Sequence, residues 1–70
     1  GPFDILISIT ENCPHKVENI RTGHVVAYFP WGDSPPGDKF ADRDTALKRA
    51  IDYRDYLNDT YDSEQGSQKL

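Results

Sequence analysis

Cysteine and histidine are scarce in this chain, which has one cysteine, Cys13, and two histidines among 70 residues. One cysteine cannot form an internal disulfide, and with two histidines it cannot complete a structural zinc site. We therefore expect no metal and no cofactor. The lack of a disulfide indicates a reducing compartment, that is the cytoplasm, or the nucleus if the organism is eukaryotic. We interpret Cys13 as a partly buried small apolar residue.

Long apolar runs and targeting signals are also missing. No stretch approaches the roughly 18 residues of a membrane-spanning helix, so we expect no membrane partner. The start of the chain has no basic flank and is not typical of a signal peptide. Gly1 and Pro2 are typical of the remnant of a protease-cleaved tag, and we leave them out of the predicted domain.

The basic surplus typical of nucleic-acid-binding domains is absent. The formal net charge is −4. Basic and acidic residues are equal in number between Pro14 and Asn58, so the body of the domain is neutral. The surplus acid lies near the two ends, at Asp4, Glu11, Asp59, Asp62 and Glu64. This distribution counts against a nucleic-acid partner.

Catalytic patterns are missing as well. The serines lack the context of a nucleophile elbow, and the glycines are too scattered to form a phosphate-binding loop. The acidic pair Asp42 and Asp44 is better explained by helix capping than by catalysis. A chain of this size also has too small a core to enclose a substrate cavity. We therefore predict a non-enzymatic binding domain without a small-molecule substrate.

Three strand patterns are present. Apolar and polar residues alternate over residues 3–10, which is the period of a half-buried strand. Leu6 interrupts the polar side of this pattern, which indicates that part of the second face is covered too. Lys16–Arg21 is predicted to form a second strand. His24–Phe29 is rich in β-forming side chains and is predicted to form a central strand.

Turn residues separate these strands. Gly23 readily supplies the positive φ of a tight hairpin turn between the second and third strands. The segment Pro30–Asp38 is rich in proline and glycine and is predicted to be a loop. After this loop, Lys39–Ala41 would return as a short fourth strand at the edge of the sheet.

An amphipathic helix is predicted to begin near Asp42 or Asp44. Asp44 is the expected N-cap because its carboxylate can accept hydrogen bonds from exposed backbone N–H groups. Apolar residues then recur at spacings of three and four, at Ala46, Leu47, Ala50, Ile51, Tyr53 and Leu57. Residues 62–70 are polar and are interpreted as a disordered tail or linker.

Together these patterns predict one α+β domain over residues 3–61, with a three- to four-stranded antiparallel sheet packed on one face by a single C-terminal helix. One helix covers one face, so the opposite face is predicted to be open and to be the binding surface. Trp31, in the proline-rich loop, has two interpretations. It folds back to cap the core, or it stands exposed as an interface residue, a role in which tryptophan is enriched. His15 and His24 are both interpreted as ordinary exposed polar residues.

Two segments carry a resemblance to a known family. In Arg21–Tyr28 a basic-Thr-Gly turn precedes a strand with aromatic and small residues. In Asp38–Asp55 a phenylalanine leads into an alanine-containing helix with a tyrosine and an acid near its end. This order resembles the Apetala-two (ethylene-response-factor) DNA-binding domain, its phage and bacterial relatives, and the arm-binding domains of tyrosine integrases. The similarity covers about residues 16–57.

The resemblance implies that the sheet face enters the major groove of double-stranded DNA. The candidate contacts that it implies are Lys16, Arg21, His24 and Tyr28, with Trp31 beside them. Two features differ from the family. The family's DNA-facing strands carry several arginines, whereas Arg21 stands nearly alone here, and the proline-rich loop is longer and more acidic.

The sequence therefore leaves two main functions open. The first is a nucleic-acid-binding module that uses the open sheet face, as the resemblance implies. The alternative is a protein-interaction module, such as a small acidic regulator or inhibitor of phage or mobile-element origin, as the charge and the exposed aromatic residues indicate. A third interpretation is that the chain is one domain of a larger protein.

Overall fold

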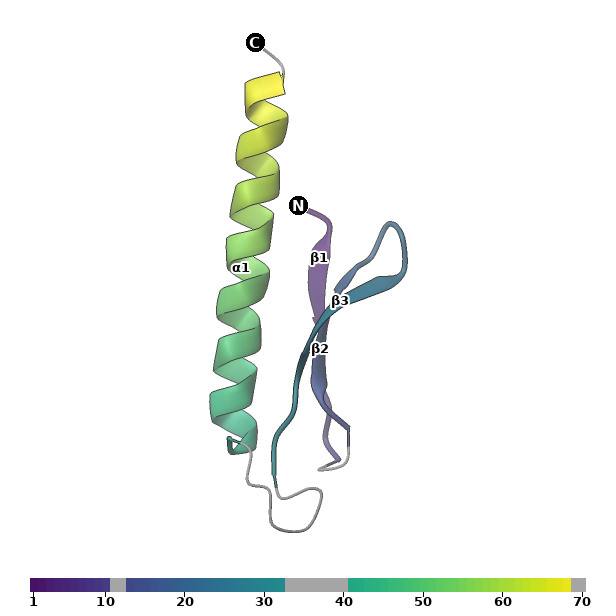
Figure 1. The fold of residues 1–70 in the computed structure, drawn as a ribbon, viewed down its shortest axis with the longest axis vertical. Helices are drawn as coiled ribbons and strands as arrows, with labels where there is room; N and C mark the ends of the chain where they lie inside the picture. The colour runs from purple at the N-terminus through teal and green to yellow at the C-terminus, as the bar shows by residue number, and fades with distance from the viewer. Residues whose placement is uncertain (11–12, 33–40, 69–70) are drawn as a thin grey trace.

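The computed structural model of the chain describes residues 1–10, 13–32 and 41–68, with side chains described as far as Gln65. It contains strands β1 (Phe3–Leu6), β2 (His15–Asn19) and β3 (His24–Phe29), followed by helix α1 (Arg43–Gln68). The strands form one antiparallel sheet in the order β1-β2-β3, and α1 lies along one side of it (Figure 1). This confirms the predicted α+β fold in its three-stranded form.

The predicted fourth strand falls largely outside the described residues. Of Lys39–Ala41 only Ala41 is described, and it forms an isolated parallel bridge with Trp31. The Gly32 N–H donates to the Ala41 carbonyl at 3.0 Å. The start of the helical segment is therefore held next to the end of the β3 segment.

β1 ends at Leu6, so the predicted strand over residues 3–10 was too long. Ser8 lies where the strand would continue. Its N–H donates to His15 Nδ1 at 3.0 Å, and its hydroxyl donates to the Thr10 carbonyl at 2.9 Å. Such local side-chain bonds compete with a strand ladder. The chain therefore leaves the sheet after Leu6.

β2 and β3 form the hairpin predicted around Gly23. The Asn19 side-chain oxygen accepts the N–H groups of Arg21 at 2.9 Å and Thr22 at 3.2 Å, and the Asn19 carbonyl accepts from Gly23 N–H at 2.8 Å. Gly23 has a φ of 78°, in the left-handed region that favours glycine. These bonds end β2 at Asn19, two residues short of the prediction, whereas β3 spans the predicted residues.

The core between α1 and the sheet is small. Its buried apolar residues are Val17, Trp31, Ala46 and Ala50. The two alanines have small side chains, so the first half of α1 can approach the sheet closely. Trp31 is only 8% exposed, which confirms that it folds back on the core. Its alternative interpretation, as an exposed interface residue, was wrong.

His15 is fully buried, so its interpretation as an exposed polar residue was wrong. Its ring stacks on Trp31, with 6.0 Å between ring centroids. Since the Ser8 N–H donates to Nδ1, Nε2 carries the proton and donates to the Arg43 carbonyl at 3.2 Å. Arg43 Nε donates in turn to the Ser8 carbonyl at 3.0 Å. These bonds connect three segments and explain how a polar ring is buried here.

The N-cap of α1 is Asp42 rather than the predicted Asp44. The helix begins at Arg43, and the Ala46 N–H donates to the Asp42 carbonyl at 3.0 Å. The Thr45 hydroxyl donates to the Asp42 carboxylate. This hydrogen bond lowers the pKa of Asp42 below its ordinary value of 3.8.

The face of α1 that packs on the sheet follows the predicted spacing but differs in its second half. Beyond the two buried alanines, its half-buried residues include Leu47, Ile51, Arg54, Leu57, Asn58 and Tyr61. Tyr53, which was predicted to extend the apolar stripe, is 38% exposed. With about 3.6 residues per turn, Arg54 and Asn58 take the positions nearer the sheet.

α1 continues to Gln68, so residues 62–68, which were interpreted as a disordered tail or linker, are helical and not disordered. Its last turns extend past the end of the sheet (Figure 1). Propagating an existing helix is far easier than nucleating one, and no proline interrupts this segment. The polar composition that indicated a tail is compatible with an exposed helix, whose Asp62 carboxylate accepts a hydrogen bond from the N-terminal ammonium of Gly1 at 3.1 Å.

The N-terminal residues pack more tightly than predicted. Pro2 is buried, and its carbonyl accepts the Ile20 N–H at 2.8 Å, so leaving Pro2 out of the domain was wrong. Next to it, Phe3 is bound by one side chain of α1. The Phe3 N–H donates to Asn58 Oδ1 at 3.0 Å, and Asn58 Nδ2 donates to the Phe3 carbonyl at 3.1 Å.

Across the described residues, α1 included, no helix combines the length and the apolar character needed to cross a membrane.

Replacing Asn58 tests its role in holding β1. Asn58→Ala leaves the N–H and carbonyl of Phe3 without their partner in a part-buried position, so we expect the free energy of unfolding to fall by about 1–3 kcal/mol. The matched control is Asp59→Ala, which alters an exposed neighbour on the same helix and is expected to change stability by about 0.5 kcal/mol or less. Urea denaturation monitored by circular dichroism measures both. Equal effects would contradict the assigned role.

Asp42 gives a pH-dependent prediction. Asp42→Asn keeps a capping side chain but removes the charge. Because the pKa of Asp42 is lowered in the folded state, its carboxylate stabilises the fold above pH 3.8, and this contribution is lost as pH falls through the lowered value. We expect the wild-type chain to be more stable than Asp42→Asn near neutral pH. The difference should shrink in acid, and a difference that stays constant from pH 7 down to about pH 2 would contradict the prediction.

Candidate functional site

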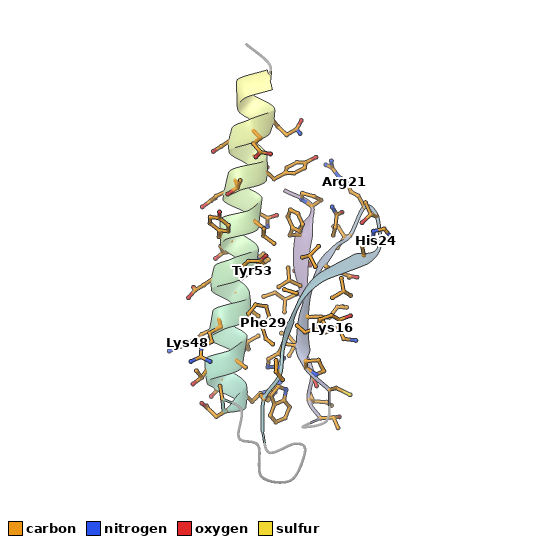
Figure 2. All side chains as sticks on the ribbon, viewed as in Figure 1. Lys16, Arg21, His24, Phe29, Lys48 and Tyr53 are labelled. Atoms are coloured by element: carbon orange, nitrogen blue, oxygen red, sulfur yellow. The ribbon has the colours of Figure 1, made fainter. Side chains whose placement is uncertain are left out.

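The face of the sheet that points away from α1 is the candidate site. Side chains alternate along a strand, and His15 and Val17 are buried on the α1 side, so Lys16 and Glu18 point to the opposite side. Figure 2 shows Phe29 and Tyr53 between the sheet and the helix, and Lys16 on the far side of the sheet. We call this surface the open face, and it comprises Asp4, Leu6, Lys16, Glu18, Val26 and Tyr28.

One row of the open face crosses all three strands. Leu6 pairs with Lys16, and Lys16 pairs with Tyr28. Leu6 is 45% exposed and Tyr28 is 61% exposed. Lys16 lies between them, and the aliphatic part of a lysine can cover apolar neighbours while its ammonium stays in water. The row therefore offers an apolar and aromatic contact with one cation at its centre.

The neighbouring row is acidic at one end and apolar at the other. Asp4 pairs with Glu18, and a register shift at Val17/Glu18 brings Glu18 opposite Val25. Val26, beside that irregularity, is 45% exposed. Asp4 Oδ1 accepts the Ile5 N–H at 2.8 Å and lies 3.4 Å from Arg54 Nη1. The open face thus carries one lysine and two carboxylates and is not basic.

Arg21, a predicted contact, points away from the open face. Its Nη1 donates to the Tyr61 hydroxyl at 3.0 Å, and its guanidinium carbon lies 5.8 Å from the centroid of the Tyr61 ring. Both contacts direct the cation toward α1. His24 is exposed at the start of β3, near the hairpin turn (Figure 2).

The predicted site residues are therefore only partly brought together. Lys16 and Tyr28 are cross-strand partners, and His24 lies at the end of the same hairpin. Trp31 belongs to the core instead. The predicted set also lacked Leu6, although its apolar side chain at a polar position was a signal. That signal was taken to mean that the second face is partly covered, but Leu6 is exposed.

Cys13 is exposed rather than partly buried, so its predicted environment was wrong. Within residues 1–10, 13–32 and 41–68, no group of three or more His, Cys, Asp or Glu side chains is arranged to hold a metal ion.

Comparison of the chain with models of protein families, with curated proteins and with solved structures gave no match. The resemblance to the Apetala-two family therefore stays a prediction.

Proposed function

We propose that this chain is a protein-binding domain whose contact surface is the open face of the sheet. The observation that carries the proposal is the row of Leu6, Lys16 and Tyr28, which runs across all three strands with its apolar ends exposed. A domain with so small a core gains from burying such side chains against a partner. Tyrosine is enriched in the centres of protein interfaces.

The charges of the open face favour a partner with basic residues. Glu18 lies at the rim of the apolar row and forms no ion pair with a described residue, whereas Asp4 beside it is paired with Arg54, and the chain as a whole has a net charge of −4. Complementary potentials speed association and suppress wrong partners. The partner that fits this surface is therefore a protein segment with apolar side chains flanked by lysine or arginine.

Duplex DNA, which the family resemblance implies, is the competing partner. Lys16, Tyr28 and the nearby His24 are the residues that would contact it. Two features count against it. The Arg21 guanidinium is engaged with Tyr61, and Asp4 and Glu18 would repel phosphates next to the one lysine of the face. We therefore propose a protein partner, and the test below distinguishes it from duplex DNA.

A capture experiment with matched variants tests the proposal. Immobilised wild-type chain is compared with Tyr28→Ala, and with Ile9→Ala, which alters an 83% exposed residue outside the sheet. We expect a protein that both the wild-type chain and Ile9→Ala retain and that Tyr28→Ala loses. With that protein purified, Tyr28→Ala should bind about tenfold or more weakly, as expected for a central aromatic contact.

Two results would overturn the proposal. The first is equal capture by the wild-type chain and Tyr28→Ala. The second is an NMR titration with duplex DNA at low salt that perturbs Lys16 and Tyr28, with an affinity that falls steeply as salt rises, since phosphate contacts release counterions. That result would identify DNA as the partner of this face. Circular dichroism spectra of all variants establish that they are folded.

A further inference from the structure

The two outer edges of the sheet differ in how far other parts of the chain satisfy their outward backbone groups. At the β1 edge, Asn58 binds both the N–H and the carbonyl of Phe3, and Asp4 Oδ1 accepts the Ile5 N–H. The outward N–H groups of this strand are therefore satisfied. Proteins commonly protect edges with polar side chains in this way, because an open edge pairs with other chains.

The β3 edge is protected only in part within the described residues: the register shift at Val17/Glu18 interrupts it near Val26, and Pro30 follows the strand, which leaves Ala27–Phe29 between them. There β3 pairs with β2 alone. Its sequence, His-Val-Val-Ala-Tyr-Phe, contains no lysine, carboxylate or proline, which are the residues that usually discourage pairing at an edge. It consists largely of strong β-formers. This edge is therefore chemically suited to accept another strand.

The register identifies a backbone group that faces outward on β3. Phe3 and Ile5 turn their N–H groups away from β2, so their partners Asn19 and Val17 turn theirs toward β3. Val17 is paired with Ala27, so Ala27 faces β2, and the next residue, Tyr28, faces outward. The N–H and carbonyl of Tyr28 thus point to this edge, and no described residue outside β2 and β3 bonds to them.

An aromatic surface on α1 lies beside this edge. The ring of Phe29, at the end of β3, lies 5.9 Å from that of Tyr53, and the Tyr53 ring stacks on that of Tyr56 at 6.5 Å. Tyr53 is 38% exposed and Tyr56 is 62% exposed. Arg54 and Asn58 reach β1 instead, so the two tyrosines lie on the β3 flank of the helix. A strand added about 4.8 Å beyond β3 would direct alternate side chains toward Tyr53.

We propose that the β3 edge, together with Tyr53 and Tyr56, binds an extended segment of a partner protein as a fourth strand. Main-chain bonds at Tyr28 supply affinity, and alternate apolar side chains packing on Tyr53 supply selectivity. This surface shares Tyr28 with the open face but uses its backbone and not its side chain, so signals at Tyr53 on one side and at Leu6 and Lys16 on the other separate the inference from the proposed function.

The charge of Arg49 indicates which kind of segment would bind at the β3 edge. Arg49 lies one helical turn before Tyr53 on the same flank of α1 and forms no ion pair with any described residue. An extended segment with an acidic residue at this end would complement it.

An NMR titration with a synthetic peptide tests the inference. The probe is an end-blocked peptide in which valine alternates with threonine and glutamate, and the control peptide has the same sequence with N-methyl groups on alternate amides. We expect the probe to shift the Tyr28 amide and the Tyr53 ring signals and to slow hydrogen exchange at the Tyr28 amide. The amides of Phe3 and Ile5, on the protected edge, should not move. The N-methylated peptide should have no effect.

A pair of variants isolates the backbone contribution. Tyr28→Ala and Tyr28→Pro both lose the tyrosine side chain, but only the proline variant loses the outward N–H, and proline is tolerated where that group faces solvent. We expect Tyr28→Pro to bind the probe about fivefold to tenfold more weakly than Tyr28→Ala, the loss of one hydrogen bond. If Tyr28→Pro does not fold, the comparison of the two peptides decides the question.

Four outcomes would overturn the inference. They are a Tyr28 amide that is already protected from exchange in the free chain, equal binding of the two peptides, shifts confined to Leu6 and Lys16 on the open face, and no shifts at the highest soluble peptide concentration. Dimerisation of the free chain with protection of the Tyr28 amide would likewise assign the edge to a second copy.

Discussion

The buried imidazole of His15 is the contact on which the arrangement of this domain depends. It accepts a hydrogen bond from Ser8, donates one to Arg43 and stacks on Trp31. One ring thereby holds the segment after β1, the strand β2, the segment after β3 and the first residue of α1. In a chain whose buried apolar residues are few, a buried ring with both nitrogens hydrogen-bonded supplies order that the apolar core alone would not.

Fixing α1 at this junction determines which surfaces the chain leaves free. Arg54 and Asn58 of the helix bind β1, and Tyr53 packs on Phe29 of β3. The far side of the sheet is left to Leu6, Lys16 and Tyr28. The asymmetry between the β1 and β3 edges follows from the same placement, because Asn58, which satisfies the β1 edge, lies on the flank of the helix that faces away from β3.

The sequence was a good guide to the fold because its local signals agree with one another. The β-forming residues of β3, the glycine turn and the spacing of Ala46, Leu47 and Ala50 are all local signals, and each was confirmed. Boundaries were less accurate where a side chain intervened. Ser8 ended β1 early, Asn19 ended β2 early, and Asp42 rather than Asp44 capped the helix. Such choices depend on which of several competing polar groups finds a partner.

The candidate site was predictable only in part, for a physical reason. The family resemblance implied Lys16 and Tyr28 as contacts, and cross-strand pairing in the predicted hairpin brings them together on one face. No local pattern could reveal that Arg21 would meet Tyr61, or that His15 would be enclosed by residues far from it in the chain. Both depend on tertiary contacts. Trp31 had two interpretations for the same reason, since a loop residue is buried or exposed according to what it meets.

The double hydrogen bond between Asn58 and Phe3 also constrains the order of folding. It joins residues 55 positions apart, whereas the β2–β3 hairpin closes within a few residues. Contacts between distant residues carry a larger entropic penalty and form more slowly. The hairpin is therefore expected to form first, and β1 to be secured last. Until α1 has docked, the Asn58 side chain does not bind the backbone of Phe3, and the edge of β1 is exposed in the newly made chain. This interval is when the domain is most vulnerable to aggregation.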